Sequence, residues 1–302
     1  MSDPALEAVF REIAEADPSG ERMAKTLRET IDQLYDGQHT GRFRWDQLYK
    51  TEKTHCGTLV EINLQRQFEF ADGVNLDFKI AGVDVDCKYS QAHGGWMIPN
   101  EAHGELCLLV TADDASSRWS AGLVRADESK LNSGRNRDSK ATLSADGRAS
   151  ISWLRLGAQL PPNVLLSLPE DDLDAIFALR SGQKRVNELF RRAQGRRIGR
   201  GVVATVAQQD DYMKRVRENG GARSQLQDEG IVILGDYTSH RLLAQRLGLE
   251  RPERGESVSA RLVKCGAGDA WSAEIDGQAW RVATDADAVE IAPRLPRLSV
   301  AS

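Results

Sequence analysis

The sequence predicts an α/β protein of the α+β kind, built from two domains. Three observations predict it: helical spacing of apolar residues over the first seventy positions, a run of short apolar segments between residues 75 and 126, and a proline pair at Pro161 and Pro162. At 302 residues and 40% hydrophobic content, the chain is long enough for two cores. We place the domains at residues 1–154 and 163–302, with LGAQLPPNV as the linker between them.

The first domain begins with helices. Two segments carry apolar residues at helical spacing, namely Leu6, Val9, Phe10 and Ile13, and then Met23, Leu27, Ile31 and Leu34. The sequence DPSG separates them, and Asp17 or Ser19 can cap the second helix. A third helix is expected over KTEKTHCGTLVEINLQRQFEF, which places Glu61 near its middle.

Four short segments then predict a sheet: NLDFKIAG, VDVDCKYS, ELCLLVTA and SAGLVRA, each apolar and bounded by Gly, Asp or Ser. In the second segment, residues 83, 85 and 87 fall on one strand face, whereas Asp84, Asp86 and Lys88 share the other. That charged face fits either a solvated strand or a metal site with a lysine beside it.

The second domain combines helices with later strands. Apolar and basic residues alternate at helical spacing in VNELFRRAQGRRI and GRGVVATVAQQDDYMKRVRE. In LQDEGIVILG, a helix that ends at a glycine before a buried strand has the shape with which winged helix-turn-helix modules close. The segments SVSARLVKCG, WSAEIDG and QAWRVAT are expected to be short strands.

The charge is unevenly distributed. Residues 180–223 hold twelve Lys or Arg against four Asp or Glu, which gives this segment a net charge of +8. Because the whole chain has a net charge of −5, the other residues together carry −13. A dense arginine block favours phosphate binding, and the alternative is a solvated helix pair.

Other classes find no support in the sequence. The amino-terminal residues lack the basic start and apolar run of a signal peptide, and no apolar stretch approaches the roughly 20 residues that span a bilayer, so we expect a soluble cytoplasmic protein with no membrane partner. The four cysteines form no CxxC pair and the five histidines form no HExxH motif, which argues against a disulfide framework or a structural zinc site.

Hydrolysis of a phosphodiester needs carboxylates that hold Mg²⁺ and a lysine near the attacking water or the phosphate. Asp77 and Asp86 can meet across a hairpin, Lys88 lies on the same face as Asp86, and Glu61 lies upstream. An acid two residues before a lysine is common by chance, so spacing alone leaves this hypothesis open.

Five stretches resemble the NaeI family of type II restriction endonucleases, in order, over roughly residues 30 to 235. They are RFRWDQLYKTEKTHCGTLVEINL, AGVDVDCKYS, VNELFRRAQGRRIGR, VATVAQQDDYMKRVR and GGARSQLQDEGIVILG. The resemblance implies an N-terminal endonuclease domain of the PD-(D/E)xK class. It also implies a C-terminal winged-helix DNA-binding domain like that of the catabolite activator protein.

The resemblance also implies catalytic residues. Glu61 matches the family's helix acid, Asp77 the first Asp of the motif, and Asp86 and Lys88 its second acid and lysine. Asp77, Asp86, Glu61 and the backbone carbonyl of Cys87 would bind Mg²⁺, and Lys88 would position or deprotonate the attacking water. Leu76 stands where the general pattern has proline, and the extra acid Asp84 is expected to be a dispensable surface or supporting residue.

The implied function is double-strand cleavage of a palindromic DNA site by a homodimer, activated by a second DNA copy on the C-terminal domain. The residues expected to contact DNA are Arg196, Arg197, Arg200, Lys214, Arg215, Arg217 and Arg223. Two alternatives remain: a winged-helix DNA-binding regulator without nuclease activity, and a nicking or repair nuclease on the same fold.

Overall fold

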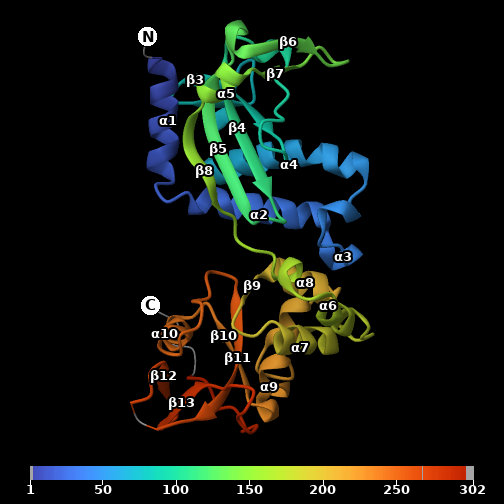
Figure 1. Ribbon diagram of the computed structural model, residues 1–302, viewed down its shortest axis with the longest axis vertical. Coiled ribbons are helices and arrows are strands. Elements are labelled where there is room, and N and C mark those ends of the chain that lie inside the picture. The colour runs from blue at the N-terminus through green and yellow to red at the C-terminus, as the bar shows by residue number, and fades with distance from the viewer. Residues whose placement is uncertain (1–2, 267, 297–302) are drawn as a thin grey trace. The chain divides into compact units, whose positions relative to one another are not determined.

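The computed structural model describes residues 3–266 and 268–296. The chain divides into two compact units (Figure 1). The N-terminal unit comprises Met1–Leu34 and Arg44–Pro162, and the C-terminal unit comprises Tyr35–Phe43 and Asn163–Ser302. No helix within the described ranges is long and apolar enough to cross a membrane.

The predicted helices of the N-terminal unit are confirmed as α1 (Pro4–Ala16), α2 (Glu21–Tyr35) and α4 (Lys50–Phe68). Both proposed caps of α2 are used. The Asp17 carboxylate accepts from the backbone N–H of Arg22 at 3.2 Å and of Met23 at 2.9 Å, and the Ser19 hydroxyl accepts from that of Glu21 at 3.3 Å. Glu61 lies near the middle of α4, as predicted.

A six-stranded sheet with the order β1-β2-β3-β4-β5-β8 forms the centre of this unit. Its strands are β1 (Ala71–Asp72), β2 (Phe78–Ile80), β3 (Val83–Tyr89), β4 (Leu106–Asp113), β5 (Arg118–Arg125) and β8 (Ser152–Gln159). Only β3 and β4 pair in parallel, and the other pairs are antiparallel. The four strands expected from the sequence are therefore confirmed.

Helices pack on the sheet, and β4 is buried along almost its whole length. Helix α4 packs on β3, and α1 packs on β5 and β8 (Figure 1). A second cluster of buried side chains, which includes Trp96, Ile98 and Leu109, lies where the hairpin of β6 (Leu131–Arg135) and β7 (Ala141–Leu143) joins the unit. The short helix α5 (Ala145–Ala149) follows β7.

Two segments differ from the expected division of the chain. Leu156–Gln159 belong to β8, where Gln159 pairs with Arg118 of β5, so the first half of the predicted linker is wrong. The segment Tyr35–Phe43, which contains α3 (Gly37–Thr40), belongs to the C-terminal unit rather than to a continuous first domain. The Phe43 ring stacks on Phe177 at 5.7 Å between centroids, which fixes this segment in the C-terminal core.

The C-terminal unit has a helical half and a sheet half. The helical half contains α6 (Glu170–Phe177), α7 (Gly182–Arg192), α8 (Arg200–Ala207), the 3₁₀ turn η5 (Tyr212–Val216) and α9 (Ala222–Gln225). The sheet joins β10 (Ile231–Gly235), β11 (Ser257–Lys264), β13 (Gln278–Val282) and β12 (Ser272–Ile275) in that order, with β9 (Arg197–Ile198) also on β11. Helix α10 (Thr238–Arg246) packs on β10, and the predicted strands are confirmed.

Helical spacing overstated the length of α8. The helix ends at Ala207 and Gln208 turns left-handed at φ 50°, whereas the sequence pattern continued to residue 218. The Arg185 guanidinium donates to the carbonyls of Val206 at 2.6 Å and Ala207 at 2.8 Å. These contacts take the carbonyls that a further helical turn would use, so a distant arginine terminates α8.

Candidate active site

The β2–β3 hairpin brings the two predicted aspartates together. Lys79 pairs with Asp84 and Phe78 with Val85, so Asp77, just before β2, lies across from Asp86 on β3. The Asp77 carboxylate accepts a hydrogen bond from the backbone N–H of Cys87 at 2.7 Å. This bond fixes Asp77 against β3.

The Lys88 ammonium lies at the point where the predicted oxygen ligands meet. Its Nζ donates to Asp86 Oδ1 at 2.7 Å, to the carbonyl of Cys87 at 2.9 Å and to Asp77 Oδ2 at 3.4 Å. Two carboxylates and one carbonyl thus surround one cation. Oxygen ligands of this kind are those that Mg²⁺ prefers.

Asp86 is the most buried member of the cluster, with 3% of its surface exposed. Burial raises the pKa of its carboxyl to about 6, against the opposing charge of Lys88. The oxygen Oδ2 is buried and has no hydrogen-bond partner among the described residues. A buried, unpartnered carboxylate oxygen is costly, and a cation would relieve that cost.

Lys88 remains charged in this setting. Burial alone would lower the pKa of its ammonium, but the charges of Asp86 and Asp77 outweigh burial and raise that pKa to about 12. The half-buried ammonium therefore donates hydrogen bonds but is a poor base while both carboxylates contact it.

Glu61 lies near this cluster on α4, which packs on β3. Burial and the negative charge of Asp77 raise the pKa of its carboxyl. The described residues nevertheless contain no group of three or more His, Cys, Asp or Glu side chains arranged to hold a metal ion. The structure thus brings Asp77 and Asp86 into one cluster and places Glu61 at its margin.

Asp84 has a more specific place than a solvated surface residue. Its Oδ2 accepts hydrogen bonds from the backbone N–H groups of Val74 at 3.0 Å and Asn75 at 2.9 Å. These residues form the turn that leads into Asp77. Gly73 is needed in this turn because a side chain there would come within 2.2 Å of the Leu76 carbonyl oxygen. The sequence left open whether Asp84 is a surface or a supporting residue, and spacing did not reveal these turn contacts because Val74 lies ten residues before Asp84.

The expected DNA-contacting residues are scattered over the C-terminal unit. Arg196 and Arg200 are exposed, but Arg196 donates to the Ser167 carbonyl at 2.9 Å. Arg197 on β9 forms an ion pair with Glu250 at 3.0 Å. Its charge is therefore neutralised within the unit.

The other four lie on and after η5. Lys214 and Arg215 both pair with Asp211, at 3.7 Å and 2.8 Å, and Arg217 is exposed. Arg223 on α9 is half-buried and donates through Nε to the Ile233 carbonyl at 3.0 Å, so it contacts the inside of its own unit.

Much of the basic block has a structural role. Arg191 binds Glu229 through two hydrogen bonds of 2.7 Å, and Arg192 pairs with Asp172 at 2.8 Å. Together with Arg185 of α7, whose side chain binds the last carbonyls of α8, these arginines join segments within the unit. Net charge along the sequence therefore overstates the positive charge available to a phosphate backbone.

Comparison with known proteins defines the class of the chain as a restriction endonuclease. A family profile described as restriction endonuclease NaeI matches residues 7–291. The type II restriction enzyme NaeI of Lentzea aerocolonigenes is 51% identical over 306 residues, covering 98% of this chain and 96% of the relative. The chain belongs to the NaeI family of type II restriction endonucleases, a family of site-specific deoxyribonucleases.

Proposed function

We propose that the chain cleaves both strands of a palindromic DNA site in a reaction that requires Mg²⁺. The convergence of Asp77, Asp86 and the Cys87 carbonyl on the Lys88 ammonium carries this proposal. A cluster that already holds one cation with three oxygen atoms has the charge and the donor type for a divalent ion.

The residues fit the ion. Asp86 Oδ2, buried and unpartnered, offers an oxygen that no described donor uses. Asp77, Asp86 and the Cys87 carbonyl would hold Mg²⁺, with Glu61 contributing directly or through water. When bound, the ion would supply a water of lowered pKa and neutralise charge on the phosphate.

The remaining chemistry falls to side chains of this chain. The Lys88 ammonium is a hydrogen-bond donor that can hold the attacking water or an oxygen of the scissile phosphate. The Asp77 carboxylate, fixed by the Cys87 N–H, orients that donor. Asp84 keeps the turn before Asp77 in place. The PD-(D/E)xK assignment of the N-terminal unit rests on this arrangement together with the family membership.

The C-terminal unit would act as a winged-helix module that binds a second DNA copy. The succession of α7, α8, η5 and α9 before the β10–β11 pair supports this proposal. Of the seven expected contacts, exposed Arg200 and Arg217 are the ones we favour for phosphate binding. A two-fold site on DNA further favours a homodimer.

The test is digestion of DNA with the purified protein and Mg²⁺, followed by sequencing of the ends. We expect double-strand cuts at one palindromic sequence and none after chelation of the metal. Binding without cutting would favour a regulator, and single-strand cuts or cuts without sequence preference would favour a nicking or repair nuclease. An uncleavable oligonucleotide that carries the site should speed cleavage if a second DNA copy activates the enzyme.

A further inference from the structure

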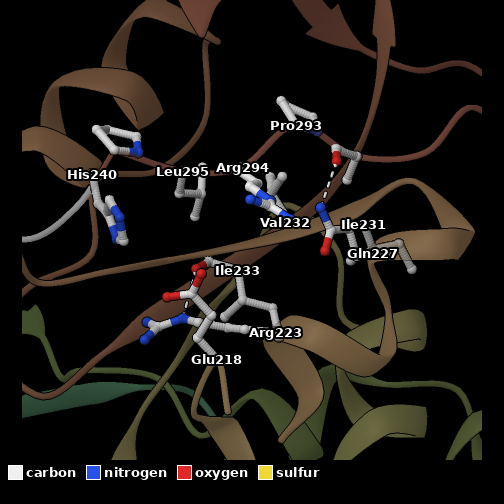
Figure 2. A pocket seen from close by; sticks show the side chains of 12 residues that line it. Glu218, Arg223, Gln227, Ile231, Val232, Ile233, His240, Pro293, Arg294 and Leu295 are labelled. Carbon is white, nitrogen blue, oxygen red and sulfur yellow. Dashed lines mark hydrogen bonds between the residues drawn. The ribbon is translucent and has the colours of Figure 1, made fainter. Parts of the chain in front are cut away.

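A pocket of about 300 Å³ lies in the C-terminal unit, between α9, β10, α10 and the segment 292–296. Figure 2 shows the Arg223 and Glu218 side chains on one side and His240, Leu295 and Arg294 on the other. The proposed catalytic cluster belongs to the other unit, so this pocket has no part in the chemistry above.

His240 supplies a fixed donor. Only 3% of its surface is exposed, and its Nδ1 accepts from the backbone N–H of Gly235 at 3.1 Å. Nδ1 is therefore unprotonated, and in the neutral ring the proton resides on Nε2. Burial lowers the pKa of the ring to about 4, which keeps it neutral near pH 7. Nε2 is buried without a hydrogen-bond partner among the described residues.

Arg223 supplies a fixed cation beside that donor. Its Nε is bound to the Ile233 carbonyl, and its guanidinium lies over the Tyr237 ring at 6.0 Å. A Cβ at Gly235 would lie 2.7 Å from Nη2 of Arg223, so the guanidinium packs directly against the backbone that also binds His240. Gly235 thus contacts both side chains and places the Arg223 guanidinium close to the His240 ring.

The rest of the lining decides what kind of molecule fits. Ile231, Ile233, Pro293 and Leu295 give an apolar wall, and Arg294 adds a second cation against the single acid Glu218. Volumes of this size are at the small end of ligand pockets. A buried N–H donor that no described residue satisfies costs free energy, and an acceptor on a ligand would recover that cost.

We propose that this pocket binds a small organic molecule with an oxyanion head group, either a carboxylate or a phosphate monoester. Arg223 holds the head group, His240 Nε2 donates to it once the ligand has displaced the side chains that cover this buried atom, and the apolar wall holds the body. In this proposal Arg223 binds the small molecule and does not contact DNA.

Calorimetric titration of the full-length protein with benzoate, phenyl phosphate and inorganic phosphate tests this proposal. We expect one of the two organic probes to bind more tightly than inorganic phosphate, and the preferred probe identifies the head group. Absence of binding by both organic probes at millimolar concentration would overturn the proposal. Equal affinity for inorganic phosphate would contradict the role of the apolar wall.

Variants make the assignment specific. Arg223→Met and His240→Asn should each weaken binding about tenfold, since each removes a hydrogen bond to a charged group. Asn keeps an acceptor near the position of Nδ1 and so retains the bond to Gly235. Glu218→Gln changes an exposed side chain and should strengthen binding about threefold by removing a like charge. Arg246→Met, exposed on the same helix as His240, is the matched control and should change nothing.

The direction of the Glu218 effect protects the test against folding artefacts. A misfolded Arg223 or His240 variant would lose binding for an uninformative reason, whereas a gain of affinity cannot arise that way. Unchanged affinity in Arg223→Met, His240→Asn and Glu218→Gln together would place the probe elsewhere and refute the proposed pocket.

Discussion

Lys88 Nζ donates a hydrogen bond to Asp86 Oδ1 at 2.7 Å, and the second oxygen of that carboxylate, Oδ2, is buried without a partner in the described part of the chain. Oδ1 of the carboxylate thus has a cationic partner within the protein, whereas Oδ2 has none among the described residues. The unsatisfied oxygen supports the proposal that Asp86 binds a metal ion, because a buried carboxylate oxygen without a partner is costly.

Asp86→Asn should abolish most cleavage while DNA binding persists. The amide has nearly the same shape as the carboxylate but carries no charge for a cation, so we expect the cleavage rate to fall by a factor on the order of 10³. Single-turnover cleavage and a DNA-binding titration measure the two effects. Asp113→Asn, which alters a turn-capping acid at the end of β4, is the control. Retained cleavage in Asp86→Asn would remove Asp86 from the mechanism.

Asp84→Ala should raise the Mg²⁺ concentration needed for cleavage. Loss of its two hydrogen bonds frees the turn before Asp77, and we expect a shift of about tenfold from this loss of positioning. Asp84→Asn keeps an oxygen acceptor and should restore most of the response. Asp113→Ala removes a similar turn contact away from the cluster and serves as the comparison. If cleavage depends on Mg²⁺ concentration in the same way for all of these variants, Asp84 is dispensable.

DNA affinity should fall steeply with salt. If about six phosphates contact Lys or Arg, affinity drops by some three decades between low and moderate salt. Arg217→Ala should lower the slope of log affinity against log salt by about one, since that side chain is exposed. Arg191→Ala should leave the slope unchanged and lower stability, because Arg191 binds Glu229. A flat salt response would contradict phosphate binding by the basic block.

His240 should make the protein less stable in acid. The ring pKa is lowered from 6.5 to about 4 in the folded state, so between these values the unfolded chain binds a proton that the folded chain excludes. The free energy of unfolding is therefore highest, as far as His240 is concerned, above about pH 6.5. It falls by up to about 3 kcal/mol as the pH falls toward 4. Denaturant unfolding of wild type and His240→Asn at pH 4.5 and 7.5 measures it. Parallel pH dependence in both proteins would contradict the buried neutral ring.

Phe43→Ala should destabilise the C-terminal unit. The ring belongs to the core that contains Phe190 and Ile233, and its removal should cost about 3 kcal/mol. Hydrogen exchange should accelerate in α7 and leave β4 protected. Phe70→Ala, in the N-terminal unit next to Phe78, should have the reverse effect. Faster exchange in β4 alone after Phe43→Ala would contradict the assignment of Tyr35–Phe43 to the C-terminal unit.

Strong periodicity made several elements predictable. Helix α2 and strand β3 follow from apolar spacing of 3.6 and 2 residues, and the alternation in β3 places Asp86 and Lys88 on one face. The Asp77 position was also foreseeable, because a short hairpin fixes which residues lie opposite each other.

Other features depend on partners far along the chain. Arg185 ends α8 by binding its last carbonyls, although the local pattern continues, and Phe43 joins a core built mostly from residues beyond 160. The Leu156–Gln159 segment has the sequence of a linker, but in the structure it pairs with β5. Local spacing carries no information about such partners.

The same distinction holds for the two sites. Sequence specified the elements, the family and the identity of the charged cluster, since these depend on residue type and short-range spacing. Tertiary structure decided that Lys88 would occupy the centre of three oxygens, that Asp84 would hold a turn, and that Arg223 would face a pocket beside His240. Hydrogen bonding and burial depend on which distant atoms come into contact, and only the folded chain determines those contacts.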